Sequence, residues 1–438
     1  MNEFLGLLSR QLAGDIRALP ARARRRLSDQ RVERLGTIDE LRTAARREIP
    51  RVMFDFVDGG AGDEVTTKRN RTDFSELAIV PRVLVDVSDV SLATSVLGTP
   101  VAVPLLSAPM GLCGLVHHGG ESAIARAMHG VGAIHVLGAM ASYTIEEVAA
   151  ASPGPTWFQM YLWRDRGLMR HLLDRSQAAG HAALVVTVDV PVAAPRDRDR
   201  RNGFGAPPRV TLRSLAGGLA RPRWSAQFIR DPRMTFKILA GPGGAPVEAG
   251  EISSYIARQF NPAATWEDLS WLREQWPGPI VVKGVLRPQD ARLAVSLGAA
   301  AIAISNHGGR QLDHAPSTIR ALPAIVDAVG SEAEILLDGG IRRGSDILKA
   351  LALGAGACMV GRPLVYGLGA AGEAGARRAI EILIAELRGA IGLAGCPSVD
   401  KLDRTWVTEA ARSPAERSPD GRSSASASAH EHDERRER

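Results

Sequence analysis

Cysteine and aromatic residues are scarce in this sequence. Three cysteines occur among the 438 residues, and Cys113, Cys358 and Cys396 form no CxxC pair. A disulfide framework and a cysteine-based metal site are therefore excluded; we expect no metal, and a reducing compartment. Aromatic residues make up 5% of the chain, whereas glycine is abundant with 45 residues. This balance favours an α/β architecture over an aromatic-rich β-sandwich, because small residues let helices pack closely on a sheet.

Long apolar runs are also missing. No stretch of about 18 uncharged apolar residues occurs, so we expect no membrane-spanning helix. The first residues lack the apolar core of a secretory signal peptide, which predicts a cytoplasmic protein. The composition, 45% hydrophobic and 23% charged, is typical of a globular protein.

Positive charge gathers in two segments of the chain. Residues 1–36 contain the cluster Arg22, Arg24, Arg25 and Arg26, and in residues 196–237 basic side chains far outnumber acidic ones. Neither segment accompanies a nucleic-acid recognition motif. The net charge of +6 therefore does not indicate a nucleic-acid partner.

Composition and capping signals divide the chain into three parts. The sequence Thr37-Ile-Asp-Glu40 is a capping box, which predicts that a helix and the folded domain begin there. We expect residues 1–36 to be a solvated basic extension. From residue 410 the chain is rich in Ser, Arg, Glu and His and has almost no large apolar residues, so 410–438 is predicted to be disordered. The folded domain is expected to span 37–409.

A repeated unit fills this domain: a short apolar run, a polar or glycine-containing turn, and an alanine- and leucine-rich helical stretch. The apolar runs are continuous, as in parallel strands that helices cover on both faces. We predict a (β/α)8 barrel with an N-terminal helical segment and a long basic insertion, 196–250, between the fourth and fifth strands. The eight runs lie at 103–109, 133–139, 157–162, 183–189, 280–285, 301–307, 334–340 and 357–363.

Several of these runs end in polar residues. In a (β/α)8 barrel the active site lies at the carboxyl ends of the strands, so these residues are the functional candidates. They are Gln159, Tyr161, Thr187, Asp189, Lys283, Ser305, Asn306, His307, Asp338, Gly361 and Arg362.

The sixth run ends in a base next to an anion binder. His307 follows the strand, and Arg310 comes three residues later beside two glycines. Histidine moves protons near neutral pH, and arginine grips a carboxylate through two parallel hydrogen bonds. Asp189 could orient His307 and stabilise its imidazolium form. The alternatives are a structural core histidine and a helix-capping aspartate.

The last two strands end in glycine and arginine. The segments 338–346 and 360–363 occupy the usual phosphate position of this fold, where backbone amides and Arg362 would bind a phosphate monoester. Lys283 closes a buried strand and needs an anionic partner, because an unpaired buried ammonium is costly. A reduced flavin would supply that partner, and a Schiff-base lysine is the competing interpretation.

Three motifs occur in order and at barrel spacing: Ser305-Asn-His-Gly-Gly-Arg-Gln-Leu-Asp313, Asp338-Gly-Gly-Ile-Arg-Arg-Gly-Ser-Asp346 and Val360-Gly-Arg362. With them, residues 37–408 resemble the FMN-dependent 2-hydroxy-acid oxidase and dehydrogenase family, which includes L-lactate and (S)-mandelate dehydrogenases. The resemblance implies that an L-2-hydroxy acid, mandelate- or lactate-like, becomes a 2-keto acid while FMN takes two electrons. It implies a site with His307 as base, Asp189 as its partner, Tyr161 on the substrate hydroxyl, and Arg196 and Arg310 on the substrate carboxylate.

The same resemblance implies a flavin site. Backbone and side-chain groups would contact the ring system, Lys283 would lie near N1, and a glycine- and arginine-lined pocket would hold the phosphate. The implied residues are Ala108, Pro109, Met110, Gln159, Thr187, Lys283, Ser305, Asp338, Gly340, Arg342, Gly361 and Arg362.

The substrate pocket departs from the family pattern. The family normally has a tyrosine in the early helix, and Phe56 stands there instead, which removes a hydrogen bond to the substrate carboxylate. Gly111 and Met140 occupy positions whose size affects the acid's side chain. We expect the small Gly111 to leave room, and hence a bulky or apolar side chain on the acid.

The basic insertion also carries Leu219, Trp224, Phe228 and Ile229. Arginine combined with such side chains suits an interfacial segment on an anionic membrane, and a lid over the active site is the alternative. The segment resembles the insertion of the membrane-associated dehydrogenases. We therefore expect a dehydrogenase, peripheral on the inner face of the cytoplasmic membrane, that passes electrons to a quinone or another acceptor. Family members are commonly homotetramers.

Other functions on the same fold remain as alternatives. A mycofactocin-type flavoprotein, which modifies a peptide-derived cofactor, would suit Phe56 but would lack Arg310. A flavin-binding module without turnover and an FMN-assisted isomerase are the other two, and flavin bleaching by a hydroxy acid would distinguish both from a dehydrogenase.

Overall fold

The computed structural model describes residues 31–203, 217–231, 238 and 258–410. Most of the expected N-terminal extension, parts of the insertion and the predicted disordered tail lie outside the described residues. The packed structure begins earlier than the expected boundary at Thr37, because Val32 is buried and Arg378 donates a hydrogen bond to the carbonyl of Leu35. The capping box at Thr37 is present, with Glu40 N donating to Thr37 Oγ1 at 3.1 Å.

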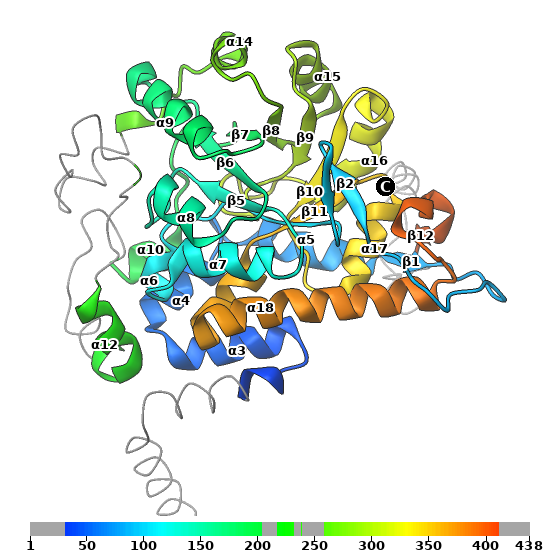
Figure 1. The fold of residues 1–438 in the computed structure, drawn as a ribbon, viewed down its shortest axis with the longest axis horizontal. Coiled ribbons are helices and arrows are strands. Elements are labelled where there is room, and N and C mark those ends of the chain that lie inside the picture. The colour runs from blue at the N-terminus through cyan, green and yellow to red at the C-terminus, as the bar shows by residue number, and fades with distance from the viewer. Residues whose placement is uncertain (1–30, 204–216, 232–237, 239–257, 411–438) are drawn as a thin grey trace, which may run out of the picture.

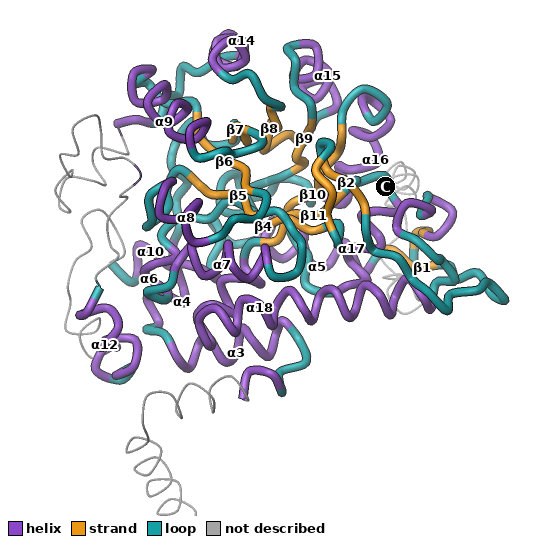
Figure 2. The backbone as a smooth tube through the Cα atoms, viewed as in Figure 1, coloured by secondary structure: helices purple, strands orange, loops and turns teal. Residues whose placement is uncertain are grey.

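Eight parallel strands form the predicted barrel, and each overlaps one of the eight apolar runs. The sheet order is β4-β11-β10-β9-β8-β7-β6-β5, and a parallel bridge between Leu106 and Ile134 joins its two ends. Figure 2 shows the ring of strands enclosed by helices. The strands are β4 (Leu105–Ser107), β5 (His135–Gly138), β6 (Thr156–Tyr161), β7 (Leu184–Thr187), β8 (Ile280–Val285), β9 (Ala301–Ile304), β10 (Glu334–Asp338) and β11 (Ala357–Val360).

Helices follow the strands and cover the outside of the barrel (Figure 1). They are α6 (Cys113–Val116), α7 (Gly120–His129), α8 (Ile145–Ala151), α9 (Arg166–Ala178), α14 (Trp266–Gln275), α15 (Pro288–Ser296), α16 (Thr318–Val329), α17 (Gly344–Ala352) and α18 (Arg362–Leu393). Helix α18 breaks at Ala371 and Gly372, where the backbone leaves the helical region.

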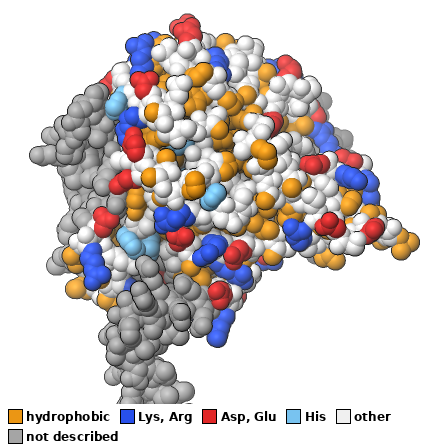
Figure 3. Space-filling view, in the orientation of Figure 1, with side chains coloured by type: hydrophobic (Ala, Val, Ile, Leu, Met, Phe, Trp, Pro, Cys, Tyr) orange, Lys and Arg blue, Asp and Glu red, His pale blue; other side chains and the backbone are white. Residues whose placement is uncertain are grey.

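The described part of the N-terminal segment contains α3 (Ile38–Glu48), α4 (Arg51–Asp58) and α5 (Val65–Ser75), and α3 lies alongside α18 (Figure 1). The insertion between β7 and β8 contains α10 (Asp197–Arg201) and α12 (Pro222–Arg230). Within the described ranges, no helix combines the length and apolarity needed to cross a membrane. On the face in Figure 3, basic and acidic side chains are interspersed.

The core has two layers. One fills the barrel and includes Trp157, Val185 and Leu336, and the other lies between the strands and the helices. The hairpin of β2 (Thr94–Val96) and β3 (Thr99–Val101) packs Val96 and Val101 against the inner layer, and Leu97 N donates to the Glu334 carboxylate at 2.9 Å. The hairpin thus closes the amino ends of the strands and leaves the carboxyl ends for the site.

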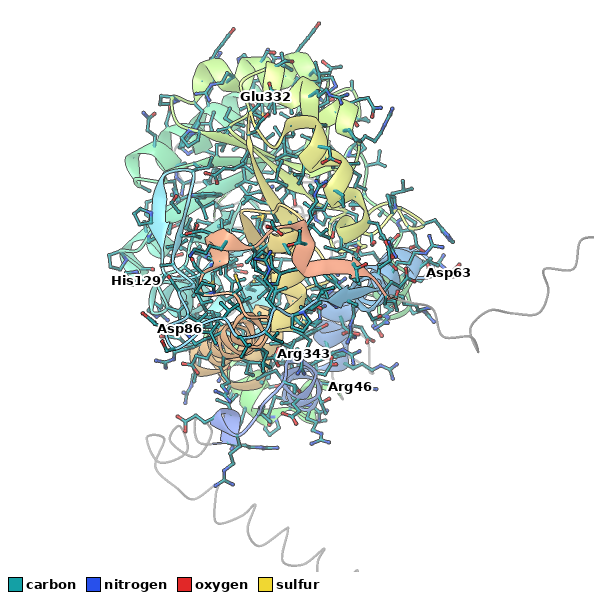
Figure 4. All side chains as sticks on the ribbon, turned by 90° about the vertical axis from the view of Figure 1, so that its right-hand side faces the viewer. Arg46, Asp63, Asp86, His129, Glu332 and Arg343 are labelled. Atoms are coloured by element: carbon teal, nitrogen blue, oxygen red, sulfur yellow. The ribbon has the colours of Figure 1, made fainter. Side chains whose placement is uncertain are left out.

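A small two-stranded sheet joins an early and a late part of the domain. In it, β1 (Leu77–Ile79) pairs antiparallel with β12 (Val407–Glu409). The short 3₁₀ helices η2 (Val399–Lys401) and η3 (Arg404–Trp406) precede β12 in the chain. The three cysteines are buried and free. Charged residues such as Arg46, Asp63 and Glu332 lie on the outside in the side view of Figure 4.

Candidate active site

A cavity of about 320 Å³ lies at the carboxyl ends of the barrel strands. Most of the residues predicted for the site line it: Phe56, Ala108, Pro109, Met110, Gly111, Met140, Tyr161, Thr187, Arg196, Lys283, His307, Arg310, Asp338, Gly340, Arg342, Gly361 and Arg362. Four candidates do not line it. Gln159, Asp189 and Ser305 each hydrogen-bond a lining residue. Asn306 instead exchanges two side-chain hydrogen bonds with Asn70 of α5, at 2.7 and 2.8 Å.

The structure pairs His307 with Asp189. His307 Nδ1 is 2.9 Å from Asp189 Oδ1, across 118 positions of sequence. Asp189 therefore orients the ring and is no helix cap. With Nδ1 occupied, Nε2 is the ring nitrogen left to exchange a proton with a ligand.

His307 has a left-handed backbone, with φ of 57°, and Gly308 and Gly309 follow with φ of 65° and 73°. A Cβ atom at Gly309 would lie 2.6 Å from the backbone nitrogen of Thr67, so glycine is required there. For a histidine this conformation costs about 1–3 kcal/mol, which the surrounding contacts must offset. The motif thus holds His307 in a fixed, strained turn at the end of β9.

Two arginines are held at the cavity by backbone carbonyls from the end of α4. Arg310 Nη1 donates to the carbonyls of Phe56 and Gly59, both at 2.8 Å. Arg362 donates to the carbonyls of Val57 and Gly59, at 3.2 and 3.0 Å. These contacts fix the guanidinium groups without neutralising their charge.

The cavity is electropositive. Burial, and then the charges of Arg196 and Arg362, lowers the pKa of Arg310 well below its usual value. Burial also lowers the pKa of Arg342, with Arg362 contributing. Among the described residues, Arg196 is the one of these arginines with a carboxylate within 4 Å of its guanidinium group, Asp199 at 3.5 Å. Such a concentration of buried positive charge is suited to anionic ligands.

Lys283 and Asp338, both predicted to contact the cofactor, pair with each other. Lys283 Nζ lies 2.6 Å from Asp338 Oδ2 and 2.8 Å from Ser305 Oγ, and Ser305 Oγ donates to Asp338. Burial alone would raise the pKa of Asp338, but the Lys283 charge and hydrogen bond lower it overall. Lys283 therefore already has an anionic partner within the protein, Asp338, which the sequence analysis did not predict.

Tyr161 stands at the end of β6 against an aromatic neighbour. Its ring packs edge-on to Phe260, with centroids 5.7 Å apart. Burial, and then the charge of Asp189, raises the pKa of Tyr161, which keeps its hydroxyl neutral and able to donate. Behind it, Gln159 Nε2 donates to Thr187 Oγ1 at 2.9 Å and fixes the ends of β6 and β7.

Gly111 does not leave open space, contrary to the sequence-based expectation. A Cβ atom there would lie 2.7 Å from the Cβ of Met140 and 2.8 Å from its carbonyl oxygen. The glycine is required because the loops after β4 and β5 approach each other closely. The width of the pocket therefore depends on how these two loops are held.

An ion-pair network lies beneath α4. Asp58 accepts hydrogen bonds from Arg42 at 2.5 and 2.8 Å, from Arg198 at 2.9 Å and from the Tyr366 hydroxyl at 2.7 Å. Burial would raise the pKa of Asp58, but Arg42, Tyr366 and Arg198 hold it well below the usual range. The network anchors the turn whose carbonyls bind Arg310 and Arg362.

Because the folded-state pKa of Asp58 is depressed, its stabilising contribution is present at neutral pH. It should be lost as pH falls below the unfolded value of about 3.9 toward the folded pKa. We expect the thermal midpoint of D58N to lie well below that of the unmodified protein at pH 7, and the gap to narrow between pH 4 and pH 3. Thermal unfolding across this range measures the effect, and a gap independent of pH contradicts it.

Several lining residues were not predicted, and Gln311, Val116 and Phe260 are three examples. Gln311 donates to the carbonyls of Asp189 and Val192, and it belongs to the motif that identified His307, so the signal was present. Val116 lies on the short helix α6 and Phe260 between the insertion and α14, and no pattern distinguished either of them.

Comparisons with known proteins agree with this geometry. Residues 45–409 match the model of the FMN-dependent dehydrogenase family. An L-lactate oxidase of Nostoc sp. is 45% identical over 374 residues, 84% of this chain and 96% of that protein. An L-lactate dehydrogenase of Stenotrophomonas maltophilia is 42% identical over 378 residues, 83% of this chain and 96% of that protein.

Solved structures are similar over nearly the whole fold. The monotopic membrane protein (S)-mandelate dehydrogenase has a TM-score of 0.82 and 35% identity, covering 86% of this chain and 100% of that one. A mandelate oxidase structure has a TM-score of 0.71 and 38% identity, covering 85% and 98%. The chain belongs to the FMN-dependent dehydrogenase family and is an FMN-dependent oxidoreductase.

Proposed function

We propose that this enzyme oxidises an L-2-hydroxy acid, mandelate- or lactate-like, to the 2-keto acid. The observation that carries the proposal is the pairing of His307 with Asp189 in a cavity that also presents Arg196 and Arg310. A base and a carboxylate-binding pair in one cavity are the groups that this reaction needs.

Each side chain has a distinct task in this proposal. His307 takes the proton of the substrate hydroxyl, and Asp189 stabilises the imidazolium that results. Arg196 and Arg310 bind the carboxylate, and neutral Tyr161 donates a hydrogen bond to the substrate oxygen. Together they hold the acid in one orientation against the cofactor.

The residues present fit FMN. Arg342 and Arg362 face the cavity beside Gly340 and Gly361, and their charge matches a phosphate dianion. Backbone of Ala108, Pro109 and Met110 would contact the ring system, with Gln159, Thr187, Lys283, Ser305 and Asp338 on the other strand ends. Bound there, FMN supplies the two-electron acceptor for the oxidation.

The apolar side of the cavity bears on the identity of the acid. Leu112, Val116, Met140, Val190 and Phe260 line it. Such a wall accommodates an apolar side chain better than the hydrogen atom of glycolate. We therefore propose that larger apolar hydroxy acids are preferred.

Phe56 offers a direct test of carboxylate binding. Its ring lies 5.2 Å from the guanidinium carbon of Arg310. The variant F56Y adds a hydroxyl that can bond the carboxylate, which is worth about 1.5–3 kcal/mol and should lower KM roughly tenfold or more with little change in kcat. Steady-state kinetics measures it, and F56L is the control that removes the ring. An unchanged KM in F56Y would place the carboxylate elsewhere.

The insertion supports a proposal about the electron acceptor and the location. Leu219 and Ile229 are exposed on or beside α12, together with Arg223 and Arg230. The similar (S)-mandelate dehydrogenase is a monotopic membrane protein. We propose a dehydrogenase that binds the inner face of the cytoplasmic membrane peripherally, reduces a quinone or another acceptor, and assembles as a homotetramer.

The test uses the purified, FMN-loaded enzyme. Adding glycolate, lactate or mandelate anaerobically should bleach the flavin band, fastest with the larger acids, and an artificial dye or quinone should restore it. Hydrogen peroxide formation as fast as dye reduction would make the enzyme an oxidase. Absence of bleaching with every acid would refute the proposed function.

The peptide-modifying alternative is not favoured. Arg310 is present in the cavity, and the relatives described above are named for lactate and mandelate. A non-catalytic flavin module would not need the His307–Asp189 pair.

A further inference from the structure

Glu121 is a buried carboxylate outside the cavity. It lies in the first turn of α7 and is 2% exposed. Its Oε1 accepts hydrogen bonds from two backbone amides, Cys113 N at 2.9 Å and Ser142 N at 3.1 Å. Burial raises its pKa, because removing a carboxylate from water costs free energy. The two hydrogen bonds offset part of this cost.

The two amides belong to different loops. We call residues 108–113, which follow β4, the β4 loop, and residues 139–143, which follow β5, the β5 loop. They also meet directly, because Leu112 N donates to the carbonyl of Met140 at 3.0 Å. Without Glu121, the buried amides of Cys113 and Ser142 would each lack the acceptor that the structure provides.

The same loops form one wall of the cavity. Gly111 on the β4 loop and Met140 on the β5 loop are so close that a methyl group at Gly111 would not fit. Besides the direct contacts between the loops, which include Gly114 N donating to Ser142 Oγ at 3.1 Å, Glu121 is a buried group that bonds both of them. It is therefore placed to hold the spacing of this wall.

We infer that Glu121 is a positioning residue that sets the width of the substrate pocket by fixing the β4 loop against the β5 loop. The effect on substrate choice rests on the function proposed above. Glu121 touches neither acid nor flavin, and it acts through Gly111 and Met140.

Three substitutions separate this role from plain stability. E121Q keeps an oxygen that can accept both amides. E121D keeps the carboxylate but withdraws it by one methylene, and E121A removes it. The matched control is S152A, because Ser152 Oγ donates to the carbonyl of Ala125 at 3.2 Å and supports the same helix away from both loops.

The first readout needs no substrate. In the FMN-loaded enzyme, amide hydrogen exchange in peptides covering 111–114 and 140–143 should accelerate roughly tenfold or more in E121D and E121A. It should stay near the unmodified level in E121Q and S152A. Exchange in E121D equal to that of the unmodified enzyme would overturn the inference, even if E121A fails to fold.

The second readout is the ratio of kcat/KM for mandelate to that for lactate. We expect E121D to change this ratio roughly fivefold or more, mainly through KM, because loosened loops bind the acid's side chain less well. E121Q should restore the ratio, and S152A should lower only the thermal midpoint. If no acid bleaches the flavin of the unmodified enzyme, the proposed function fails, but the amide exchange result still decides whether Glu121 holds the two loops. If exchange accelerates in E121D while the ratio of kcat/KM stays unchanged, the link between Glu121 and substrate choice is refuted.

Discussion

Replacing His307 with glutamine should lower kcat by about 10²–10⁴-fold, the usual contribution of a general base. Glutamine keeps an amide that can bond Asp189 but cannot take a proton at the substrate hydroxyl. In the function proposed above Arg196 and Arg310 bind the carboxylate, and the substitution leaves both in the cavity, so KM should change little. Anaerobic flavin reduction, followed in single turnovers, measures the chemical step directly.

Two controls make the H307Q result specific. FMN content and the thermal midpoint should match the unmodified enzyme, since the substitution leaves the phosphate pocket untouched. D189N should also slow reduction, because an amide cannot stabilise the imidazolium as a carboxylate does. Reduction in H307Q within tenfold of the unmodified rate would assign the base to another group.

The variant K283M should lower the free energy of unfolding by about 3–5 kcal/mol, because it leaves Asp338 buried without its counterion. Lys283 and Asp338 have side chains 4% and 10% exposed, so water cannot replace the lost contact. The positive charge that keeps the Asp338 pKa low would be gone, and the carboxyl group should take up a proton on folding.

A double-mutant cycle separates the pair from its surroundings. The variant K283M/D338N removes both charges and should recover much of the stability lost in K283M alone. Denaturant unfolding at pH 7 provides the four free energies. If the double variant is as unstable as the sum of the two single ones, Lys283 and Asp338 do not stabilise each other, which would contradict this prediction.

The barrel could be predicted because each strand is a local signal. A continuous apolar run such as 301–304 is typical of a strand that is covered on both faces, and β9 occupies those residues, all of them buried. The ends of such strands meet at one rim, so polar residues that close them, such as His307, were expected to gather there.

Partnerships across the rim could not be read in the same way. Lys283 and Asp338 were each found as strand ends, but their mutual contact depends on which strand ends face each other. The space at Gly111 depends on the distance between two loops, so the small size of glycine alone led to the wrong prediction of an open pocket there. Phe260 follows the basic insertion, in a stretch without a periodic pattern, so the sequence could not place its side chain at the cavity.

The anchoring of Arg310 and Arg362 on the carbonyls of α4 has a consequence for how ligands arrive. The carbonyl groups orient each guanidinium group by hydrogen bonds, but they carry no net negative charge that would neutralise it. The positive potential at the carboxyl ends of the strands therefore attracts anions before they contact the protein. Dissolved salt screens this electrostatic attraction. Chloride or sulfate attracted to the same site would compete with the substrate. The apparent affinity for the acid therefore depends on the anions in the buffer as well as on the pocket.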